Sequence, residues 1–448
     1  AVLLSAAPSD GSSLHRLAGV VARELATAGY DRCDAFDLAT TPLAFCQGEF
    51  DCWVKTPGRC RAHDAEGAIV QAVHDTDALV FLDPVTFGGH GHVLKAAVDR
   101  LLCLLEPFFT TRHALTHHHM RYEARQRLFS IGWLPTPDAQ EAATFAELTD
   151  ANAINYLAPA CGTAVVDAQH ESDWPAVIRA MFEHPLTPGA AISGRAPLRD
   201  ALLAAASPEP RASEAAPVRR AALLVGSPKA RGTSASEVLA GTIAARLRHV
   251  GVTTTTHVAT EFVHARAAAL EAAADLAAAD LLFLVTPLYV DAWPSLTTHA
   301  LELVAAARTA APARLLMPRF AMLVNCGFPE AEQTRTAMRM ARHFAQRASY
   351  VWAGGLPLGG GGVVTPGTSL ETPAGPVTHI VQALDKAIPP LAATGALPPQ
   401  AIERMATSVI PDVVYRLMGD LGWRWKAHQN GLSQRALHAR PLDRPGSA

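Results

Sequence analysis

Short apolar runs bounded by turn residues recur along the chain and predict strands buried on both faces. The two clearest are Asp77–Gly88 and Asp280–Val290, in which an apolar run reaches a Pro and then a polar or aromatic loop. Such runs are typical of a parallel sheet covered by helices. Because Pro has no backbone N–H to donate, we expect each strand to stop at its Pro. The loop beyond then lies at the carboxyl edge of the sheet, where open α/β sheets bind ligands.

Helical stripes alternate with these runs in both halves of the chain. Besides the two runs above, strands are expected at Ala1–Ser5, Asp34–Leu38, Arg127–Gly132, Thr163–Val166, Ala222–Val225, Thr253–Val258, Phe320–Val324 and Tyr350–Ala353. Helical spacing is seen at Leu14–Leu25, Val93–Leu101, Asp138–Ile154, Trp174–Glu183 and Val238–Val250. The alternation predicts an α/β protein with a five-stranded parallel sheet in each half.

The two halves match as an internal repeat. Pro8 and Pro228 are 220 residues apart and Pro84 and Pro287 are 203 apart, so the first half carries 17 extra residues between its two loops. A stretch rich in Pro and Ala, Ser207–Pro217, predicts a linker. We therefore expect four parts: a domain at 1–205 with a Cys-bearing insertion, a linker at 206–219, a domain at 220–395 and a helical tail at 396–448.

Composition narrows the classes of function. The formal net charge of −3 leaves no electrostatic footprint for nucleic acid. The Ala-rich stretch Ala267–Val285 is interrupted by carboxylates, so no membrane span is expected. The chain opens on a strand-like run without a basic segment, and we expect no signal peptide. Seven cysteines in 448 residues do not form a disulfide scaffold, which favours a reducing cytoplasm.

A loop in the first half holds Cys46, Cys52 and Cys60 close together. Thiolates hold metal ions and iron–sulfur clusters, but a four-thiolate cluster needs one more ligand. Glu49 stands where a regular spacing would place that Cys, and His63 and Cys33 are conceivable substitutes. We therefore predict no [4Fe–4S] cluster and no metal site. Free or redox-pairing thiols are the alternative.

Four histidines, His113, His117, His118 and His119, crowd one region. Consecutive histidines point in different directions and seldom bind one metal ion together. We expect them in a surface or substrate-facing loop.

Both halves begin with a strand, a Ser-rich loop and a helix, the arrangement that aims backbone N–H groups and the helix dipole at an anion. The first loop carries Ser12 and Ser13, and the second runs over Gly226–Ser236. Capping of the helix by Ser is the simpler interpretation of either loop taken alone.

At these residues the chain resembles the NAD(P)H-dependent FMN reductase family, as a tandem fusion of two flavodoxin-like domains. Gly226–Ser234 is similar to that family's phosphate loop, and Pro287–Asp291 and Asn325–Glu330 resemble its flavin-facing loops. The segment Cys52–Cys60 resembles a Cys-containing branch whose pattern overlaps with iron–sulfur flavoproteins. The likeness covers most of residues 1–390, and the tail resembles an extension seen in some members.

The resemblance implies three-layer α/β/α domains with strand order 2-1-3-4-5, bound FMN, and NAD(P)H as co-substrate. It implies a second domain that holds FMN, because Ala6 and Ala7 stand where the family's first loop has Gly-Ser. No catalytic acid or base is expected, since FMN carries the hydride chemistry. The implied FMN-binding residues are Ser227, Lys229, Thr233, Ser234, Ser236, Pro287, Leu288, Tyr289, Val290, Asn325, Gly327 and Phe328, with Ser12, Ser13, Pro84, Val85, Thr86, Phe87 and Gly88 in the first domain.

Three functions are compatible with these motifs. The first is an oxidoreductase that passes electrons from NAD(P)H through FMN to a flavin, quinone or similar small acceptor. The others are a flavodoxin-like electron carrier and a partly degenerate protein with a binding or assembly module. We expect a homodimer or an intramolecular pseudo-dimer to cover the flavin's exposed edge. The apolar side chains of the tail, such as Leu417 and Trp425, suit such an interface.

Overall fold

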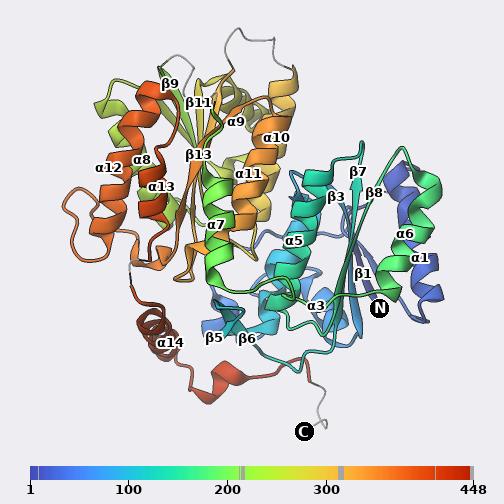
Figure 1. Cartoon of the computed structure of the whole chain (residues 1–448). Helices are drawn as coiled ribbons and strands as arrows, with labels where there is room; N and C mark the ends of the chain where they lie inside the picture. The colour runs from blue at the N-terminus through green and yellow to red at the C-terminus, as the bar shows by residue number, and fades with distance from the viewer. Residues whose placement is uncertain (9, 211, 213–216, 311–316, 409, 444–448) are drawn as a thin grey trace. The chain divides into compact units, whose positions relative to one another are not determined.

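The computed structural model describes residues 1–8, 10–210, 212, 217–310, 317–408 and 410–443. The chain divides into two compact units, shown in Figure 1. The first unit comprises Ala1–Ser193 and Arg416–Ala448, and the second comprises Gly194–Tyr415.

The first unit is built on a twisted sheet with five parallel strands. Across the sheet they are β2 (Asp34–Asp37), β1 (Val2–Ser5), β3 (Ala78–Thr86), β7 (Arg127–Leu134) and β8 (Cys161–Asp167). A two-residue strand, β4 (Gly89–His90), pairs with the end of β3 in the antiparallel direction. The predicted parallel sheet and its 2-1-3-4-5 order are confirmed.

Helices cover both faces of this sheet. The face under α1 (Ser13–Thr27) and α6 (Trp174–Glu183) is a continuous apolar core that includes Leu17, Val80 and Ile178. The other face is covered by α3 (Glu66–His74), α4 (His92–Arg100) and α5 (Ala139–Asn155). These are the three layers expected of a flavodoxin-like domain.

A β-hairpin of β5 (Leu105–Arg112) and β6 (Leu115–Met120) lies between α4 and β7 and contains the histidine-rich stretch. The prediction of a loop is wrong for His117, His118 and His119, which lie on β6 and alternate between its faces, whereas His113 lies in the turn between the two strands. Nδ1 of His117 lies 2.8 Å from Asn155 Oδ1, and burial lowers the pKa of His117 to about 4. Burial also lowers the pKa of His118 to about 3. These two imidazoles are therefore neutral, packed side chains at pH 7.

The second unit repeats the same sheet. Across it the strands are β10 (Thr253–Val258), β9 (Arg220–Val225), β11 (Leu281–Pro287), β12 (Arg319–Asn325) and β13 (Val351–Leu358). Helices α8 (Ala235–His249) and α12 (Val377–Thr394) cover one face, and α9 (Arg266–Ala278), α10 (Ser295–Ala310) and α11 (Arg335–Arg347) the other. The central strands β11 and β12 are buried almost throughout, as their continuous apolar sequences require.

Two further helices, α7 (Arg195–Ala206) and α13 (Pro399–Met405), close the β13 edge of this sheet. Trp352 Nε1 on β13 donates a hydrogen bond of 3.2 Å to the carbonyl of Ala205. The predicted linker at 206–219 thus joins α7 to β9 within the second unit, and its residues 211 and 213–216 lie outside the described part of the chain.

The last helix, α14 (Asp412–Gln429), and the residues after it provide much of the tail. Within the first unit, Trp423 packs edge-on against Phe50 and Trp53, with 5.2 Å between ring centroids in both pairs. Arg121 donates hydrogen bonds of 2.8 Å to the carbonyls of Leu437 and Ala439. The tail is therefore fastened to the Cys-bearing segment and to the β5–β6 region.

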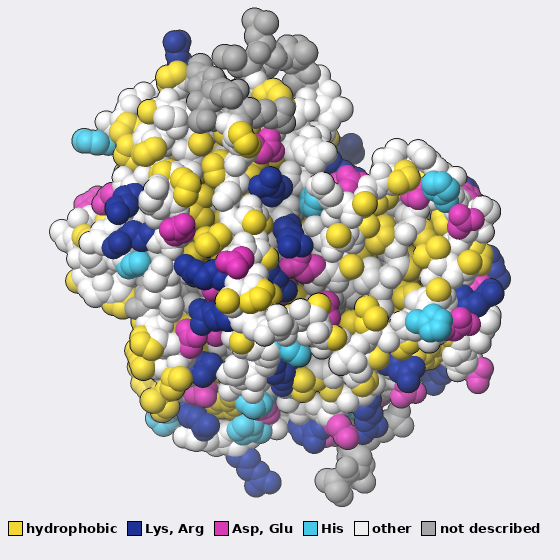
Figure 2. Space-filling view, viewed as in Figure 1, with side chains coloured by type: hydrophobic (Ala, Val, Ile, Leu, Met, Phe, Trp, Pro, Cys, Tyr) yellow, Lys and Arg dark blue, Asp and Glu magenta, His cyan; other side chains and the backbone are white. Residues whose placement is uncertain are grey.

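Lys and Arg side chains on the visible face of the second unit lie among Asp and Glu side chains (Figure 2). None of the helices within the described ranges combines the length and the apolar character that crossing a bilayer would need.

Candidate functional site at the carboxyl edge of the second sheet

The loop after β9 is pressed against the start of α10 and the end of β11. Gly226 N donates a hydrogen bond of 2.8 Å to the carbonyl of Val285. A Cβ atom on Gly226 would lie 2.6 Å from the hydroxyl oxygens of both Thr286 and Thr297. Only glycine fits such a close approach, so the predicted phosphate loop begins at a position fixed by packing.

Ser234 caps α8, and Glu237 completes a capping box. Ser234 Oγ accepts a hydrogen bond of 3.2 Å from the backbone N–H of Glu237. In return, Glu237 Oε2 accepts from Gly232 N at 2.8 Å and from Ser234 Oγ at 3.2 Å. Two donors of this loop thus point at the Glu237 carboxylate, a negative group that lies at the positive end of the helix dipole.

Ser227 in this loop and Ser236 in the first turn of α8 are both buried. Ser236 Oγ donates a hydrogen bond of 3.1 Å to Asn325 Oδ1, and the backbone carbonyl of Asn325 accepts from Leu288 N at 3.1 Å. The loops after β9, β11 and β12, far apart in the sequence, thus meet at one edge of the sheet. Ser227 Oγ accepts from Lys229 N at 3.3 Å, and Thr233 Oγ1 donates to the carbonyl of Ala230 at 2.6 Å.

The loop after β11 is a tight turn held in an uncommon backbone conformation. Tyr289 and Ala292 exchange two backbone hydrogen bonds of 2.9 and 3.1 Å. Between them Val290 and Asp291 have φ angles of 44° and 62°. A β-branched residue is costly in this left-handed region and persists only where its surroundings hold it. Pro287, the last residue of β11, and Leu288 lead directly into this turn.

The loop after β12 is braced by the glycines that follow β13. Gly361 N donates to the carbonyl of Cys326 at 2.8 Å, and Gly360 N donates to the carbonyl of Phe328 at 2.6 Å. The hydroxyl of Tyr415 donates to the carbonyl of Gly327 at 2.7 Å. Burial raises the pKa of Tyr415, so this hydroxyl keeps its proton. Tyr415 lies in the segment predicted as the tail, and its place here could not be predicted, because no local pattern links it to residue 327.

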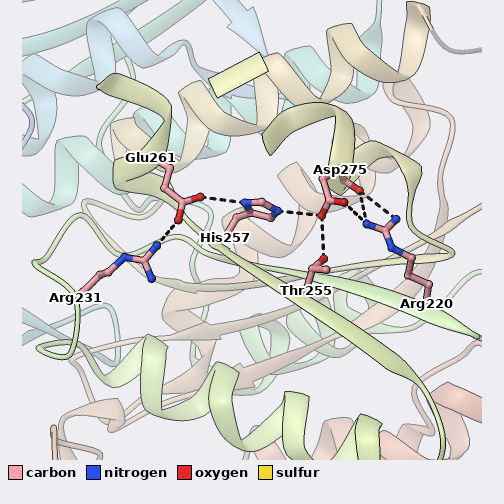
Figure 3. A network of polar contacts seen from close by, with 6 residues as sticks. All are labelled: Arg220, Arg231, Thr255, His257, Glu261 and Asp275. Carbon is pink, nitrogen blue, oxygen red and sulfur yellow. Dashed lines mark hydrogen bonds and ion pairs between the residues drawn. The ribbon is translucent and has the colours of Figure 1, made fainter. Parts of the chain in front are cut away.

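A chain of polar contacts, drawn in Figure 3, connects this loop region to β10 and α9. Arg231 of the loop pairs with Glu261, and Glu261 Oε2 lies 3.0 Å from Nδ1 of His257. Nε2 of the same imidazole lies 2.9 Å from Asp275, which also pairs with Arg220. The network pins the outer end of the phosphate loop to the edge strand.

The carboxylate of Asp275 is stabilised in its charged form. Partial burial raises its pKa, but hydrogen bonds from His257 and Thr255 and the charge of Arg220 outweigh that effect, so the pKa of Asp275 lies below its usual value. Sequence reasoning missed this network, because its members come from four separate segments.

The corresponding loop of the first unit is occupied by the protein's own carboxylates. Ser12 accepts from His15 N at 3.3 Å, and its own N–H donates to Asp10 at 2.9 Å. Ser13 Oγ donates to Glu171 Oε1 at 2.7 Å. Ala6 and Ala7 are buried between the strand and this loop.

The loop expected at Pro84–Gly88 is instead mostly strand. The prediction that Pro84 stops the strand is wrong, since β3 continues through Pro84 and Val85 to Thr86. The lost N–H matters little there, because β1 pairs with β3 only as far as Leu82. Phe87 and Gly88, with φ angles of 55° and 75°, form the turn into β4.

Backbone donors at this turn also have protein acceptors. Gly88 N donates to Glu141 Oε2 at 3.2 Å, and Gly91 N donates to Asp83 Oδ2 at 2.7 Å. The side chain of Phe87 is buried. Three carboxylates, Glu171, Glu141 and Asp83, thus accept the hydrogen bonds that an anionic cofactor would need here.

The second unit fits FMN better than the first. Its loop combines a helix N-terminus, buried hydroxyls at Ser227 and Ser236, and the amide of Asn325 at one edge. Such a set of donors suits a phosphate group and the polar rim of a flavin.

Residues 1–120 match the model of the NADPH-dependent FMN reductase family. The match agrees with the expected class of enzyme and cofactor and covers the first unit's strands as far as β3 together with the β5–β6 hairpin. No curated protein matches the chain.

Among solved structures, the chain is similar to an NAD(P)H:quinone oxidoreductase from Methanothermobacter marburgensis, with 13% identity over 41% of this chain and 96% of that one and a TM-score of 0.32. It is also similar to an azoreductase from Bacillus anthracis, with 17% identity over 41% and 94% and a TM-score of 0.28. FerB, a flavoenzyme NAD(P)H:acceptor oxidoreductase from Paracoccus denitrificans, gives 13% identity over 47% and 98% and a TM-score of 0.24. Each corresponds to less than half of this chain.

Proposed function

We propose that the chain is an FMN-dependent NAD(P)H oxidoreductase that passes electrons to a small acceptor such as a flavin or a quinone. The observation that carries the proposal is the meeting of three loops at the carboxyl edge of the second sheet, where Ser236 is hydrogen-bonded to Asn325. The family match of residues 1–120 supports the same chemistry from independent residues. We further propose that the chain arose as a tandem fusion of two such domains, and that the second holds the flavin.

In this proposal each loop has its own task. The N-terminus of α8, with the hydroxyls of Ser227, Ser234 and Ser236, holds the phosphate, and Lys229 adds a positive charge. The turn at Pro287–Val290 lies along one edge of the ring system, and Asn325–Phe328 faces the other. FMN supplies the hydride chemistry when bound, and no side chain is assigned as an acid or a base.

Glu237 sets a condition on this site. Its carboxylate accepts from Gly232 N and Ser234 Oγ, the same donors that would bind a phosphate. Two negative groups a few ångströms apart repel each other. The Glu237 side chain therefore swings out of the loop when the phosphate binds, and the loss of its two hydrogen bonds weakens binding.

The alternatives are a flavodoxin-like electron carrier and a chain whose first unit is only a binding or assembly module. In the first unit, Glu171 and Glu141 accept the hydrogen bonds that a bound flavin would need. This favours a first unit that binds no flavin and serves as a binding or assembly module. We also propose a homodimer or pseudo-dimer that shields the flavin. A cytoplasmic location suits the seven cysteines, which are all free thiols.

The test is the flavin content and activity of the purified full-length protein. We expect about one FMN per chain, and oxidation of NADH or NADPH once a free quinone or flavin is added. A carrier would hold FMN but oxidise NAD(P)H only with a partner protein present. A protein that binds no FMN after incubation with an excess would overturn the proposal.

A further inference from the structure

Four cysteines line one cavity in the first unit. Cys46, Cys52 and Cys60 come from the segment between β2 and α3, and Cys103 comes from η1 (Leu101–Leu104), the helical turn that follows α4. The cavity has a volume of about 60 Å³. That is several times the roughly 10–15 Å³ that one water molecule needs. The fourth thiol that the sequence lacks at Glu49 is therefore supplied by a distant residue.

A buried cation without a full set of acceptors faces the same cavity. Arg100 lines it, and its side chain is almost completely buried. Nη1 donates to Asp64 Oδ2 at 2.5 Å and to the carbonyl of Ala44 at 3.2 Å. Nη2 forms no hydrogen bond to an oxygen atom: an oxygen of Glu66 lies 3.9 Å away, and the guanidinium group also interacts with the thiol of Cys60. A buried guanidinium N–H is costly to leave unpaired, so this side of the cavity is suited to an electron-rich group.

The thiols themselves are in contact with one another and with carboxylates. Cys103 Sγ donates to Glu66 Oε1 at 3.1 Å and is also hydrogen-bonded to the thiol of Cys52. Burial raises the pKa of Cys60, and burial together with the charge of Asp99 raises that of Cys46. Metal ions bind cysteine as the thiolate, so a metal centre held by these sulfurs would release their protons as it binds.

The spacing of the sulfur atoms distinguishes between kinds of metal centre. Among the described residues, no three of these sulfurs lie within 4.8 Å of one another. One zinc ion, with Zn–S bonds of about 2.3 Å, would draw its four sulfurs closer than that. An iron–sulfide core separates its thiolate ligands more widely, because each thiolate binds a different iron atom.

We propose that Cys46, Cys52, Cys60 and Cys103 bind an iron–sulfur cluster, with Cys103 as the ligand from outside the inserted segment. Arg100 Nη2 then donates a hydrogen bond to a cluster sulfur or a thiolate. Such a hydrogen bond stabilises the reduced, more negative cluster and so raises its reduction potential.

The surroundings hold this arrangement together. Trp53 Nε1 donates to the carbonyl of Leu102 at 3.3 Å, which fixes the inserted segment onto η1. Phe50 lines the cavity and stacks on Trp53 with 5.0 Å between ring centroids, and Trp423 of the tail packs against both rings. The two tryptophans therefore hold the ring of Phe50 in place at the cavity wall.

The charges around the cavity are mixed. Besides Arg100, its lining includes Arg61, Glu49 and Asp99. The carboxylate of Asp99 is paired with the ammonium group of Lys95, and both side chains are buried. The pairing offsets the negative charge that Asp99 would otherwise present to an anionic cluster.

The test is the metal content of full-length protein purified without oxygen and then reconstituted with ferrous iron and sulfide. We expect about four iron and four sulfide per chain. We also expect an electron paramagnetic resonance signal after reduction by dithionite, which needs no variant. Protein that holds no iron after reconstitution, or that holds zinc without sulfide, would overturn the proposal.

Variants test the assignment of Cys103. Cys103→Ser should lose most of the iron, whereas the controls Cys33→Ser and His63→Ala should keep it, because neither residue lines the cavity. Flavin content and melting temperature, measured on the same samples, separate loss of the cluster from loss of the fold. The cluster does not depend on the proposed FMN site, so either can fail without the other. Iron retained in full by Cys103→Ser would exclude Cys103 as a ligand.

Discussion

The two units share one sheet topology but differ at the carboxyl edge, where such folds bind ligands. In the first unit Ser13, Gly88 and Gly91 donate to Glu171, Glu141 and Asp83, three carboxylates on three different elements. In the second unit one carboxylate, that of Glu237, caps the phosphate loop from within. Because Glu237 lies on the loop's own helix, it can leave without disturbing the sheet. This difference is the reason why we propose the cofactor site in the second unit and not in the first, although the topology is the same.

The largest expected effect tests this comparison directly. The double change Ser227→Ala and Ser234→Ala should remove most bound FMN, because each hydroxyl contributes about 1.5–3 kcal/mol as a hydrogen bond to a charged group. The measurement is flavin content and FMN affinity of the apoprotein. The matched control, Ser12→Ala with Ser13→Ala in the first unit, should leave flavin content unchanged. If the control loses flavin and the double variant keeps it, the roles of the two units are reversed.

A second change acts through packing. Gly226→Ala would place a Cβ 2.6 Å from two threonine hydroxyl oxygens. Overpacking of this kind costs about 1–3 kcal/mol, so we expect a lower melting temperature and weaker FMN binding. Gly241→Ala, in helix α8 with nothing within 4 Å of the new Cβ, is the control and should stabilise the fold by about 0.5–1 kcal/mol. Equal stability of the two variants would show that the loop is not packed as described.

A third change removes the carboxylate that competes with phosphate at the proposed site of the second unit. Glu237→Gln removes a negative charge from the place proposed for the phosphate, so FMN should bind roughly fivefold more tightly, a gain of about 1 kcal/mol. Titration calorimetry of the apoprotein with FMN measures this change in affinity. Glu261→Gln is the control, since Glu261 pairs with Arg231 at the outer end of the loop. Weaker FMN binding by Glu237→Gln would place the phosphate elsewhere.

The smallest effect concerns the polar network of the second unit. The pKa of Asp275 lies below its usual value, so its charged form stabilises the fold above pH 4, and that contribution is lost as the pH falls through the lowered pKa. Asp275 and its partners His257 and Arg220 are partly exposed, so we expect the charge of Asp275 to contribute at most about 1 kcal/mol to the free energy of unfolding. Melting temperatures of the wild type and Asp275→Asn should differ at pH 6 and converge below pH 3. A difference that does not change with pH would assign the effect to packing.

Much of the fold follows from local pattern. Apolar runs such as Leu281–Val285 predict strands without reference to the rest of the chain, because a strand buried on both faces must be apolar at every position. The sequence-based predictions failed where a neighbouring strand, and not the local sequence, decides the secondary structure. Pro84 lies within β3 because its neighbour β1 ends earlier, and the histidines of β6 form a strand because β5 pairs with them.

Sequence by itself determined the fold class: two α/β halves, each of which begins with a strand, a Ser-bearing loop and a helix. It also showed three cysteines close together in the first half. Only the tertiary structure decided which groups meet. It places Glu141 and Glu171 against the first unit's loops, Tyr415 against Gly327, and Cys103 beside the inserted cysteines. The physical reason is that helices and strands are specified by residues a few positions apart, whereas a site is assembled by chain ends and loops brought together by burial of the core. The spacing of residues along the chain therefore does not predict which distant residues come into contact.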